Sequence, residues 1–379
     1  MVDSERHKIV TSANLVVIKV GTRVLSREDG TLDLDRVKHL ADQMNVLRES
    51  GKKVVLVSSG AVGAGVSELN LSERPSDLGT LQAVAAIGQT KLIEAYDRFF
   101  KASGTAAAQI LLTADDLDDR PRYLNVRNTL LALLSMNAIP IVNENDSVTV
   151  EELQATFGDN DRLAALVTNL LRASVMVILS DVDGLFDRDP SDPDSKLIPT
   201  VDRIDDATMG AASTHNSSVS KGGMLSKLKA AKMATSAGEH VIIANGREPN
   251  VLQRIFNGEA LGTMFLASDR SIPPFKRWLG FSAQTRGRVF LDDGAVRALT
   301  RNGGSLLAIG ITQFQGQFGK GDVVAICDAS GSEIARGLTN YSSSELEVIR
   351  GLSSSEIADR LGHRPYDEVV HRDNLLVTE

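Results

Sequence analysis

Several features that define common protein classes are missing from this 379-residue sequence. It has one cysteine, which excludes an internal disulfide framework and any metal site built from several cysteines. Its six histidines show no HExxH-type spacing, which disfavours a zinc hydrolase. The longest apolar stretches, such as residues 130–142, are interrupted by polar residues or proline and are too short to span a membrane. Residues 1–10 are too polar for a secretory signal, so we expect a cytoplasmic protein without a membrane partner.

An excess of positive charge is also missing. Lys and Arg number 41 and Asp and Glu number 49, so the formal net charge is −8. That balance disfavours a protein whose main role is to wrap nucleic acid or to bind an anionic membrane. What is present is a hydrophobic fraction of 42%, enough for a sizeable core, in a chain long enough for two domains.

Short apolar runs alternate with helical patterns over the first two thirds of the chain. Nearly continuous runs of Val, Ile and Leu, typical of strands covered on both faces, occur at residues 15–20, 54–58, 107–112, 139–142, 175–180 and 240–244. The alternation predicts an α/β fold of three layers, with a mostly parallel sheet between two layers of helices. Ligands bind such sheets beyond the carboxyl ends of the strands.

The last hundred residues have a different pattern. The segment 187–199 is rich in Asp and Pro and predicts an exposed connection, and a second break falls at 267–274. Beyond it, strand-like runs separated by Gly-containing turns occur at 288–291, 305–309, 322–326 and 346–349. They predict a small, mostly β, barrel-like domain. We therefore expect a first domain over residues 1–268, a linker over 269–280 and a second domain over 281–379.

Candidate anion-binding groups follow the first two predicted strands. Lys19 lies at the end of the first strand, directly before a turn that contains Gly21, where it is well placed to meet a phosphate. A solvent-facing lysine fits the same position. The small residues at 58–65 let backbone N–H groups approach an anion closely. They match neither the dinucleotide fingerprint nor the P-loop pattern, and Gly-rich turns without a ligand occur in many folds.

Polar clusters follow the later strands. Short polar side chains gather at 143–147 and 180–184, and a GDND run at 158–161 opens a helix. An Asp or Asn that opens a helix is equally explained as an N-cap. Residues 220–227 place two glycines before another helix, with Lys227 in its first turn. A lysine there opposes the helix dipole, a cost that a bound phosphate would reverse.

These loops together supply at least two lysines, several backbone donors and a few carboxylates, but no nucleophile–base pair. Phosphoryl transfer requires groups of this kind, because its loose transition state is stabilised mainly by alignment of the reacting groups and by surrounding cations. Cys327 lies in an apolar strand-like run and is interpreted as a packed residue, not a catalytic thiol.

The ordered motifs resemble a known family. They are IKVGTRVL (18–25), VVLVSSGAVGAG (54–65), PIVNENDSV (140–148), GDND (158–161), LSDVDGLF (179–186) and GGMLSK (222–227). Their order is similar to that of the glutamate 5-kinases, within the amino-acid kinase family. The tail resembles a PUA domain through residues 314–343 and EVVHRDNLL (368–376). The resemblance covers nearly the whole chain.

The resemblance implies ATP-dependent phosphorylation of the glutamate γ-carboxylate to an acyl phosphate, the first committed step of proline synthesis. It implies three catalytic residues, of which Asp161 would orient the two lysines: Lys19, Asp161 and Lys227. It implies that glutamate is held by Ser59, Asp146 and Asn160. The nucleotide would be bound by Lys19, Ser180, Asp181, Lys221, Gly222, Gly223, Met224, Leu225, Ser226 and Lys227. No residue is expected to hold a metal, because Mg²⁺ would be carried mainly by the nucleotide phosphates.

Three residues in two motifs depart from the family pattern. The usual Gly-Thr before GGM is replaced by Ser220 and Lys221, and the usual Thr of a Thr-Asp pair by Ser180, which keeps the hydroxyl. Lys221 is either an additional phosphate contact or a solvent-facing loop residue. The resemblance also implies inhibition by proline. We further expect a homo-oligomer, a dimer or tetramer, and a partner reductase that takes up the labile acyl phosphate.

Two alternatives stay open. One is another enzyme of the same fold, acting on acetylglutamate or aspartate, because the fold alone does not separate these substrates. The NENDSV and GDND motifs together with the PUA-like tail favour free glutamate. The other is an RNA-binding protein that acts through its tail. Residues 281–379 contain 10 Lys and Arg and 13 Asp and Glu, so this segment has a net charge of −3. A negative net charge disfavours binding to the phosphate backbone of RNA.

Overall fold

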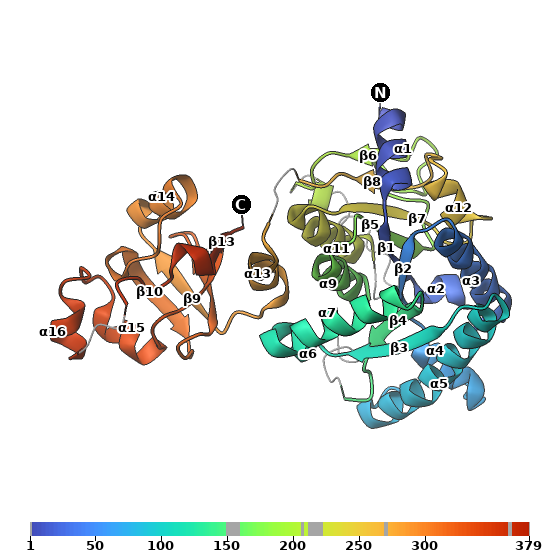
Figure 1. Ribbon diagram of the computed structural model, residues 1–379, viewed down its shortest axis with the longest axis horizontal. Helices are drawn as coiled ribbons and strands as arrows, with labels where there is room; N and C mark the ends of the chain where they lie inside the picture. Colours follow the sequence, from blue (N-terminus) through green and yellow to red (C-terminus); the bar gives the residue numbers. More distant parts are fainter. Residues whose placement is uncertain are drawn as a thin grey trace. The chain divides into compact units, whose positions relative to one another are not determined.

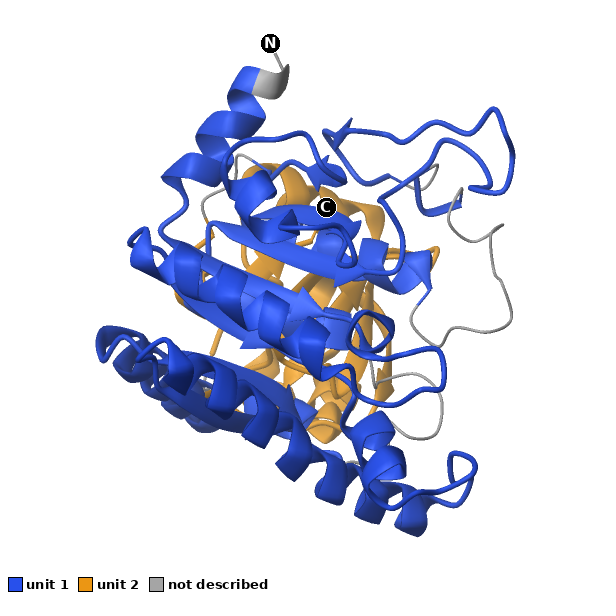
Figure 2. Cartoon of the chain, turned by 90° about the vertical axis from the view of Figure 1, so that its right-hand side faces the viewer, with its two compact units in different colours: residues 1–117, 121–271 blue, residues 118–120, 272–379 orange. Residues whose placement is uncertain are grey.

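The computed structural model describes residues 2–148, 160–205, 208–210, 223–268, 272–362 and 366–378. Contacts divide the chain into two compact units (Figure 2). Unit 1 comprises residues 1–117 and 121–271, and unit 2 comprises residues 118–120 and 272–379. This division assigns most of the expected linker to unit 2. The domain limits inferred from the sequence remain predictions.

Unit 1 is built on an eight-stranded sheet with the order β3-β4-β2-β1-β5-β7-β8-β6 (Figure 1). Its strands are β1 (Leu15–Val20), β2 (Lys53–Val57), β3 (Ala107–Leu112), β4 (Ile139–Glu144), β5 (Val175–Ser180), β6 (Thr200–Val201), β7 (His240–Asn245) and β8 (Thr263–Phe265). Neighbouring strands pair in parallel, except for β7 with β8. The mostly parallel sheet and the six strands predicted from apolar runs are confirmed.

Helices cover both faces of this sheet. The described helices before residue 260 are α1 (Val2–Ser12), α2 (Thr22–Leu25), α3 (Leu34–Glu49), α4 (Ala61–Glu68), α5 (Leu78–Ala102), α6 (Ala114–Asp118), α7 (Arg120–Ser135), α9 (Asn160–Leu171), α11 (Met224–Ala237) and α12 (Val251–Phe256). On one face α3, α5 and α12 form a common core with the strands. On the other, α9 packs on β1 and β5, and α11 packs on β7 and α9. The predicted three-layer α/β/α arrangement is confirmed.

The alternation of side chains along β1 determines where its lysine points. Val16 and Ile18 belong to the core formed with α3, α5 and α12. Because successive side chains of a strand face opposite sides, Val17 and Lys19 point toward the layer of α9. The strand reads as continuously apolar because both of its faces are buried. Lys19 therefore interrupts an otherwise apolar strand at its carboxyl end, beside α9.

Unit 2 contains a five-stranded sheet with the order β10-β9-β11-β12-β13. Its strands are β9 (Gly287–Leu291), β10 (Ile311–Gly316), β11 (Val323–Cys327), β12 (Glu333–Leu338) and β13 (Leu375–Val377). Its described helical elements are α13 (Pro274–Arg277), the π-helix η1 (Trp278–Ser282), α14 (Asp293–Asn302), the 3-10 helix η2 (Ala308–Gly310), α15 (Ser343–Ile349), α16 (Ile357–Leu361) and the 3-10 helix η3 (Arg372–Asn374). Cys327 is buried in β11. The strand-rich second domain is confirmed.

One predicted strand of this domain is wrong, because residues 346–349 lie in helix α15. A capping box starts this helix: the Ser342 hydroxyl accepts from the backbone N–H of Glu345, and the Glu345 carboxylate accepts from the backbone N–H of Ser342. Leu346 and Ile349, three residues apart, are both buried, as expected on one face of a helix. The local capping pattern outweighs the apolar run.

A second predicted strand, at residues 305–309, is also wrong. It contributes a single β-bridge, from Leu306 to Val370, and then enters the 3-10 helix η2. The backbone N–H of Gly310 donates to the carbonyl of Leu307, which closes a turn and prevents a longer ladder. Leu306 and Ala308 are buried in the unit 2 core, whereas Leu307 and Ile309 are exposed.

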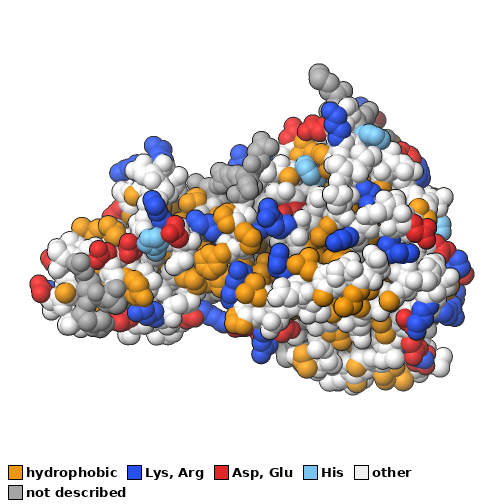
Figure 3. Space-filling view, viewed as in Figure 1, with side chains coloured by type: hydrophobic (Ala, Val, Ile, Leu, Met, Phe, Trp, Pro, Cys, Tyr) orange, Lys and Arg blue, Asp and Glu red, His pale blue; other side chains and the backbone are white. Residues whose placement is uncertain are grey.

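Charged side chains of both signs are mixed on the surface. On the face drawn in Figure 3, Lys and Arg are interspersed with Asp and Glu over the described residues. This distribution agrees with the modest negative net charge of the chain. Of the helices that the structure describes, none is long and apolar enough to cross a membrane.

Candidate functional site

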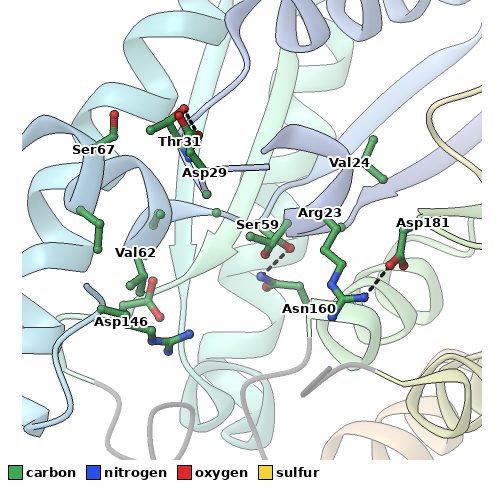
Figure 4. A pocket seen from close by; sticks show the side chains of 18 of the residues that line it. Arg23, Val24, Asp29, Thr31, Ser59, Val62, Ser67, Asp146, Asn160 and Asp181 are labelled. Atoms are coloured by element: carbon green, nitrogen blue, oxygen red, sulfur yellow. Dashed lines mark hydrogen bonds and ion pairs between the residues drawn. The ribbon is translucent and has the colours of Figure 1, made fainter. Parts of the chain in front are cut away.

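A cleft of about 920 Å³ opens at the carboxyl edge of the sheet in unit 1 (Figure 4). Its walls come from the turns after β1, β2, β4 and β5 and from the first turns of α4, α9 and α11. Seven of the residues predicted to form the site line it: Lys19, Ser59, Asp146, Asn160, Ser180, Asp181 and Lys227. The fold therefore brings together side chains from distant parts of the sequence where parallel sheets bind ligands.

Asp161 links the two predicted catalytic lysines. The Lys19 Nζ lies 2.7 Å from Oδ1 of Asp161, and the Lys227 Nζ lies 3.9 Å from Oδ2. Asp161 is fully buried, and the lysine side chains are only 8% and 7% exposed. A carboxylate at such depth requires charged partners to offset its lost hydration. One carboxylate between two ammonium groups leaves this cluster with a single net positive charge at the cleft.

Asp161 and Lys227 both lie near the start of a helix, where the helix dipole affects their charges in opposite ways. Asp161 is in the first turn of α9, where the helix dipole favours an acidic side chain. Lys227 is near the start of α11, where the dipole disfavours a cation, so its nearly complete burial there is a local cost. Asp161 compensates part of that cost. An anion bound in the cleft would compensate more.

Asn160 and Ser59 form the next contact along the cleft. The Asn160 Nδ2 donates to the Ser59 hydroxyl at 3.1 Å, as Figure 4 shows. Within the described part of the chain, the Asn160 Oδ1 is buried and has no hydrogen-bond partner. Since buried acceptors are almost always paired in folded proteins, this oxygen points to a donor that a ligand supplies. A primary ammonium group is a donor of the required kind.

The turn after β4 carries Asp146 into the cleft that Ser59 and Asn160 also line, and Figure 4 shows it to the left of these two residues. Asn143, at the end of β4, also lines the cleft, and its Nδ2 donates to the Gln89 Oε1 at 2.8 Å. Gln89 is buried in α5. Its contact holds the end of β4 in place and thereby supports the position of Asp146.

Ser180 is the last residue of β5, Asp181 directly follows it, and both line the cleft. The Ser180 hydroxyl donates to the Asp181 Oδ1 at 3.0 Å, and the Arg23 Nη1 donates to the Asp181 Oδ2 at 2.8 Å. Partial burial by itself would raise the pKa of Asp181, but hydrogen bonds from Arg23, from its own backbone and from Ser180 outweigh burial. The pKa of Asp181 is therefore below its ordinary value, and the residue is ionised at neutral pH.

Comparison with known proteins agrees with this geometry. A model of the amino acid kinase family matches residues 14–245, and a model of the PUA domain matches residues 287–361. The chain belongs to the amino acid kinase family. The resemblance found in the motifs is confirmed.

Relatives of this amino acid kinase match along nearly their whole length. The glutamate 5-kinase of Rhodopirellula baltica is 49% identical over 98% of this chain and 96% of its own. Those of Caldanaerobacter subterraneus and Bordetella parapertussis are 47% and 48% identical, over 96% and 98% of this chain and 98% of each relative. The solved UMP kinase of Ureaplasma parvum covers 67% of this chain and 99% of its own, with a TM-score of 0.46 and 15% identity.

Part of the predicted nucleotide loop of this amino acid kinase does not line the cleft or is not described. Lys221 and Gly222 lie outside the described residues, as do Gly158 and Asp159 of the GDND run. The residues that begin α11 are described but do not line the cleft: Gly223, Met224, Leu225 and Ser226. Lys227 is the member of this loop that the described cleft contains, and the roles of the others remain predictions.

Two arginines in the cleft were missed by the sequence analysis, Arg23 and Arg74. Arg23 lies within the IKVGTRVL motif, but nothing in the local pattern indicates that it meets Asp181, a residue after another strand. Arg74 lies in the loop between α4 and α5, where a charged residue reads as ordinary surface. Each arginine reaches the cleft because the fold brings distant segments of the chain together, and a local sequence motif does not show this.

Glycines in α4 and α5, and the one directly before α4, meet conformational and packing demands. Gly60 precedes α4 with a φ of +97°, which favours glycine. A Cβ on Gly65 would lie 1.9 Å from the Val84 carbonyl oxygen, and one on Gly88 would lie 1.8 Å from the Ala61 carbonyl oxygen. These two glycines therefore allow α4 and α5 to pack backbone against backbone.

The structure offers no preformed metal site in the parts of the chain that it describes. Over those ranges, no group of three or more His, Cys, Asp or Glu side chains is placed to hold a metal ion. The charged side chains that line the cleft are four cations and four carboxylates: Lys19, Arg23, Arg74, Lys227, Asp29, Glu73, Asp146 and Asp181. The ammonium and guanidinium groups suit negatively charged ligands, and the carboxylates suit a ligand that also carries an ammonium group.

Proposed function

We propose that this chain transfers the γ-phosphoryl group of ATP to the γ-carboxylate of L-glutamate and forms L-glutamyl 5-phosphate, the first step of proline biosynthesis. The observation that carries the proposal is the cluster of Lys19, Asp161 and Lys227 at the cleft. The relatives named glutamate 5-kinase, which match over nearly the full chain, support the choice of substrate.

The reaction needs no general base. A glutamate side chain with an ordinary pKa of about 4.3 is ionised at neutral pH. One of its oxygens attacks the γ-phosphorus of ATP, the bond from that phosphorus to the β,γ-bridging oxygen breaks, and ADP leaves with the electron pair. No proton changes place, so the absence of a nucleophile–base pair from the sequence motifs is no obstacle.

The main barrier is electrostatic, because two anions must meet. In this proposal Lys19 contacts the transferring phosphoryl group, Lys227 contacts the nucleotide phosphates, and Asp161 keeps both ammonium groups in position. Fixed cations in a water-poor cleft stabilise developing negative charge more than the same groups in water. Mg²⁺ bound to the phosphates would supply further positive charge. Ser180, Asp181 and the loop 221–227 would border the nucleotide.

Glutamate is expected to bind where Ser59, Asp146 and Asn160 meet. Its α-ammonium group would donate to the free Oδ1 of Asn160 and to the carboxylate of Asp146. Both residues line the cleft, and in Figure 4 Asn160 lies between Asp146 and Asp181. This arrangement would direct the γ-carboxylate toward Lys19.

Substitution of Asp146 by asparagine tests this arrangement. It removes the negative charge that faces the α-ammonium group while it keeps the size of the side chain. Since hydrogen bonds to charged groups contribute about 1.5–3 kcal/mol, the KM for glutamate should rise by about tenfold to a hundredfold. The KM for ATP should change little. An unchanged KM for glutamate in steady-state assays would remove Asp146 from the substrate site.

The activity itself is tested by trapping the acyl phosphate with hydroxylamine. Purified protein with ATP and Mg²⁺ should form the hydroxamate with glutamate and much less with aspartate or acetylglutamate. A protein that phosphorylates acetylglutamate or aspartate in preference to glutamate would refute the assignment. Addition of proline to the same assay tests feedback inhibition, which we expect to reduce the rate.

Further expectations follow from the chemistry of the product. An acyl phosphate hydrolyses readily, so a reductase that consumes it is an expected partner. We also infer a cytoplasmic homo-oligomer, a dimer or tetramer, with domain limits near residues 268 and 281. Size-exclusion chromatography coupled to light scattering measures the oligomeric state directly.

A further inference from the structure

Arg23 forms an ion pair across the mouth of the cleft. It lies in α2, directly after β1, and Asp181 lies directly after β5, the neighbouring strand of the sheet. Figure 4 shows the guanidinium group of Arg23 reaching toward Asp181, and the Nη1–Oδ2 distance is 2.8 Å. The side chains are 49% and 31% exposed. The pair therefore lies at the entrance, in contrast to the buried pairs of Asp161.

The backbone of Arg23 is held firmly while its side chain reaches into solvent. The Arg247 Nη2 donates to the carbonyl oxygen of Arg23 at 2.9 Å. The turn after β7 packs closely here, because a Cβ on Gly246 would lie 2.7 Å from a methyl carbon of the buried Val24. The guanidinium group can therefore change partner without movement of the strand or turn that carries it.

The turn between β1 and α2, which leads into Arg23, also borders the Lys19 ammonium group. A Cβ on Gly21 would lie 3.7 Å from the Lys19 Nζ and 3.3 Å from the Leu179 carbonyl oxygen. The backbone at Gly21 thus approaches the ammonium group without a side chain between them. A phosphate that contacts Lys19 would lie against this turn, two residues from Arg23.

Charge also favours a phosphate over Asp181 as the final partner of Arg23. An ion pair this exposed contributes little to stability, so its loss costs little. A guanidinium group binds phosphate oxygens through two parallel hydrogen bonds, which are stronger than those between neutral groups. The Lys19, Asp161 and Lys227 cluster has one net positive charge, less than the negative charge of a nucleotide triphosphate even with one Mg²⁺.

We propose that Arg23 is a nucleotide-binding residue that leaves Asp181 and binds the polyphosphate of ATP when the nucleotide enters the cleft. The inference rests on the proposed function, because it takes ATP to be the donor. In this role Arg23 adds a third cation to the two lysines, and the affinity for a nucleotide then depends on its phosphates. Asp181 is then released toward the remainder of the nucleotide.

Nucleotide binding by the full-length protein tests this role without any need for turnover. Displacement of a fluorescent ATP analogue gives the Kd of ATP and of adenosine for each variant. Arg23→Gln should weaken ATP binding by about tenfold or more, as expected for a charged hydrogen bond, and leave adenosine binding unchanged. Lys38→Gln, which removes an exposed lysine paired with Asp42 on α3, is the matched control and should change neither.

The Asp181→Asn background separates direct contact with phosphate from simple neutralisation of Asp181. If Arg23 binds the polyphosphate, Arg23→Gln should weaken ATP binding by a similar factor in that background. Loss of the effect there would overturn the proposal, as would equal weakening of ATP and adenosine. A wild-type protein that binds ATP but does not phosphorylate glutamate would refute the proposed function and leave this binding test valid.

Discussion

Replacement of Lys227 by alanine should lower kcat by about a hundredfold to a thousandfold, the loss seen when a group that stabilises transition-state charge is removed. The side chain is nearly buried at the cleft, and its Nζ lies 3.9 Å from the Asp161 carboxylate. Its removal leaves the phosphates without one of two fixed ammonium groups. The measurement is kcat with glutamate and ATP, together with the midpoint of thermal unfolding.

Lys229→Ala is the matched control for this variant. Lys229 lies two residues further along the same helix, and its side chain is exposed. Its replacement removes the same charge and the same helix-forming side chain, but it should leave kcat close to that of the wild type. Equal kcat values for the Lys227 and Lys229 variants would contradict the proposed role of Lys227.

Lys19→Ala is a less clean test of the same cluster. Lys19 is the closer partner of Asp161, at 2.7 Å, and Asp161 has no exposed surface. Loss of one partner from a buried ion pair is strongly destabilising, because the remaining charge stays buried. Reduced kcat in this variant would therefore combine a catalytic loss with a loss of stability. For this reason Lys227→Ala is the clearer test of the catalytic role of the cluster.

Most of the sheet of unit 1 could be predicted because its central strands are buried on both faces, whereas the strand β3 at one edge is only partly buried. The run of Val, Ile and Leu at β1 reflects that burial directly. In unit 2 the same criterion fails at α15, where the apolar residues 346–349 are buried on a helix started by Ser342 and Glu345. A short apolar run shows that a segment is buried, but its periodicity over four residues does not separate strand from helix.

The candidate site was predictable where the ordered motifs resemble those of a known family. That resemblance named Lys19 and Asp161, and the structure places them in contact. The ion pair of Arg23 with Asp181 was not predictable, because it joins two turns whose proximity depends on the order of strands in the sheet. The distance between β1 and β5 in the sequence gives no indication that they are neighbours.

Gly88→Ala should lower both the stability and the activity of the protein, although Gly88 does not line the cleft. A Cβ at this position would lie 1.8 Å from the Ala61 carbonyl oxygen and 2.3 Å from the backbone nitrogen of Gly65. No rotamer change relieves a clash with backbone atoms, so α4 must move away from α5. Overpacking of this kind typically costs about 1–3 kcal/mol.

The displacement of α4 connects this packing defect to catalysis. Ser59 and Gly60 directly precede α4, so a shift of the helix moves the loop that borders the substrate side of the cleft. Because misplacement by about 1 Å can reduce turnover a hundredfold, kcat/KM for glutamate should fall together with the midpoint of chemical unfolding. Gly79→Ala, in the first turn of the same helix α5, introduces a Cβ whose nearest neighbour is 3.9 Å away and should keep both values near those of the wild type. If the two alanine variants behaved alike, close approach of α4 and α5 would not be what positions Ser59.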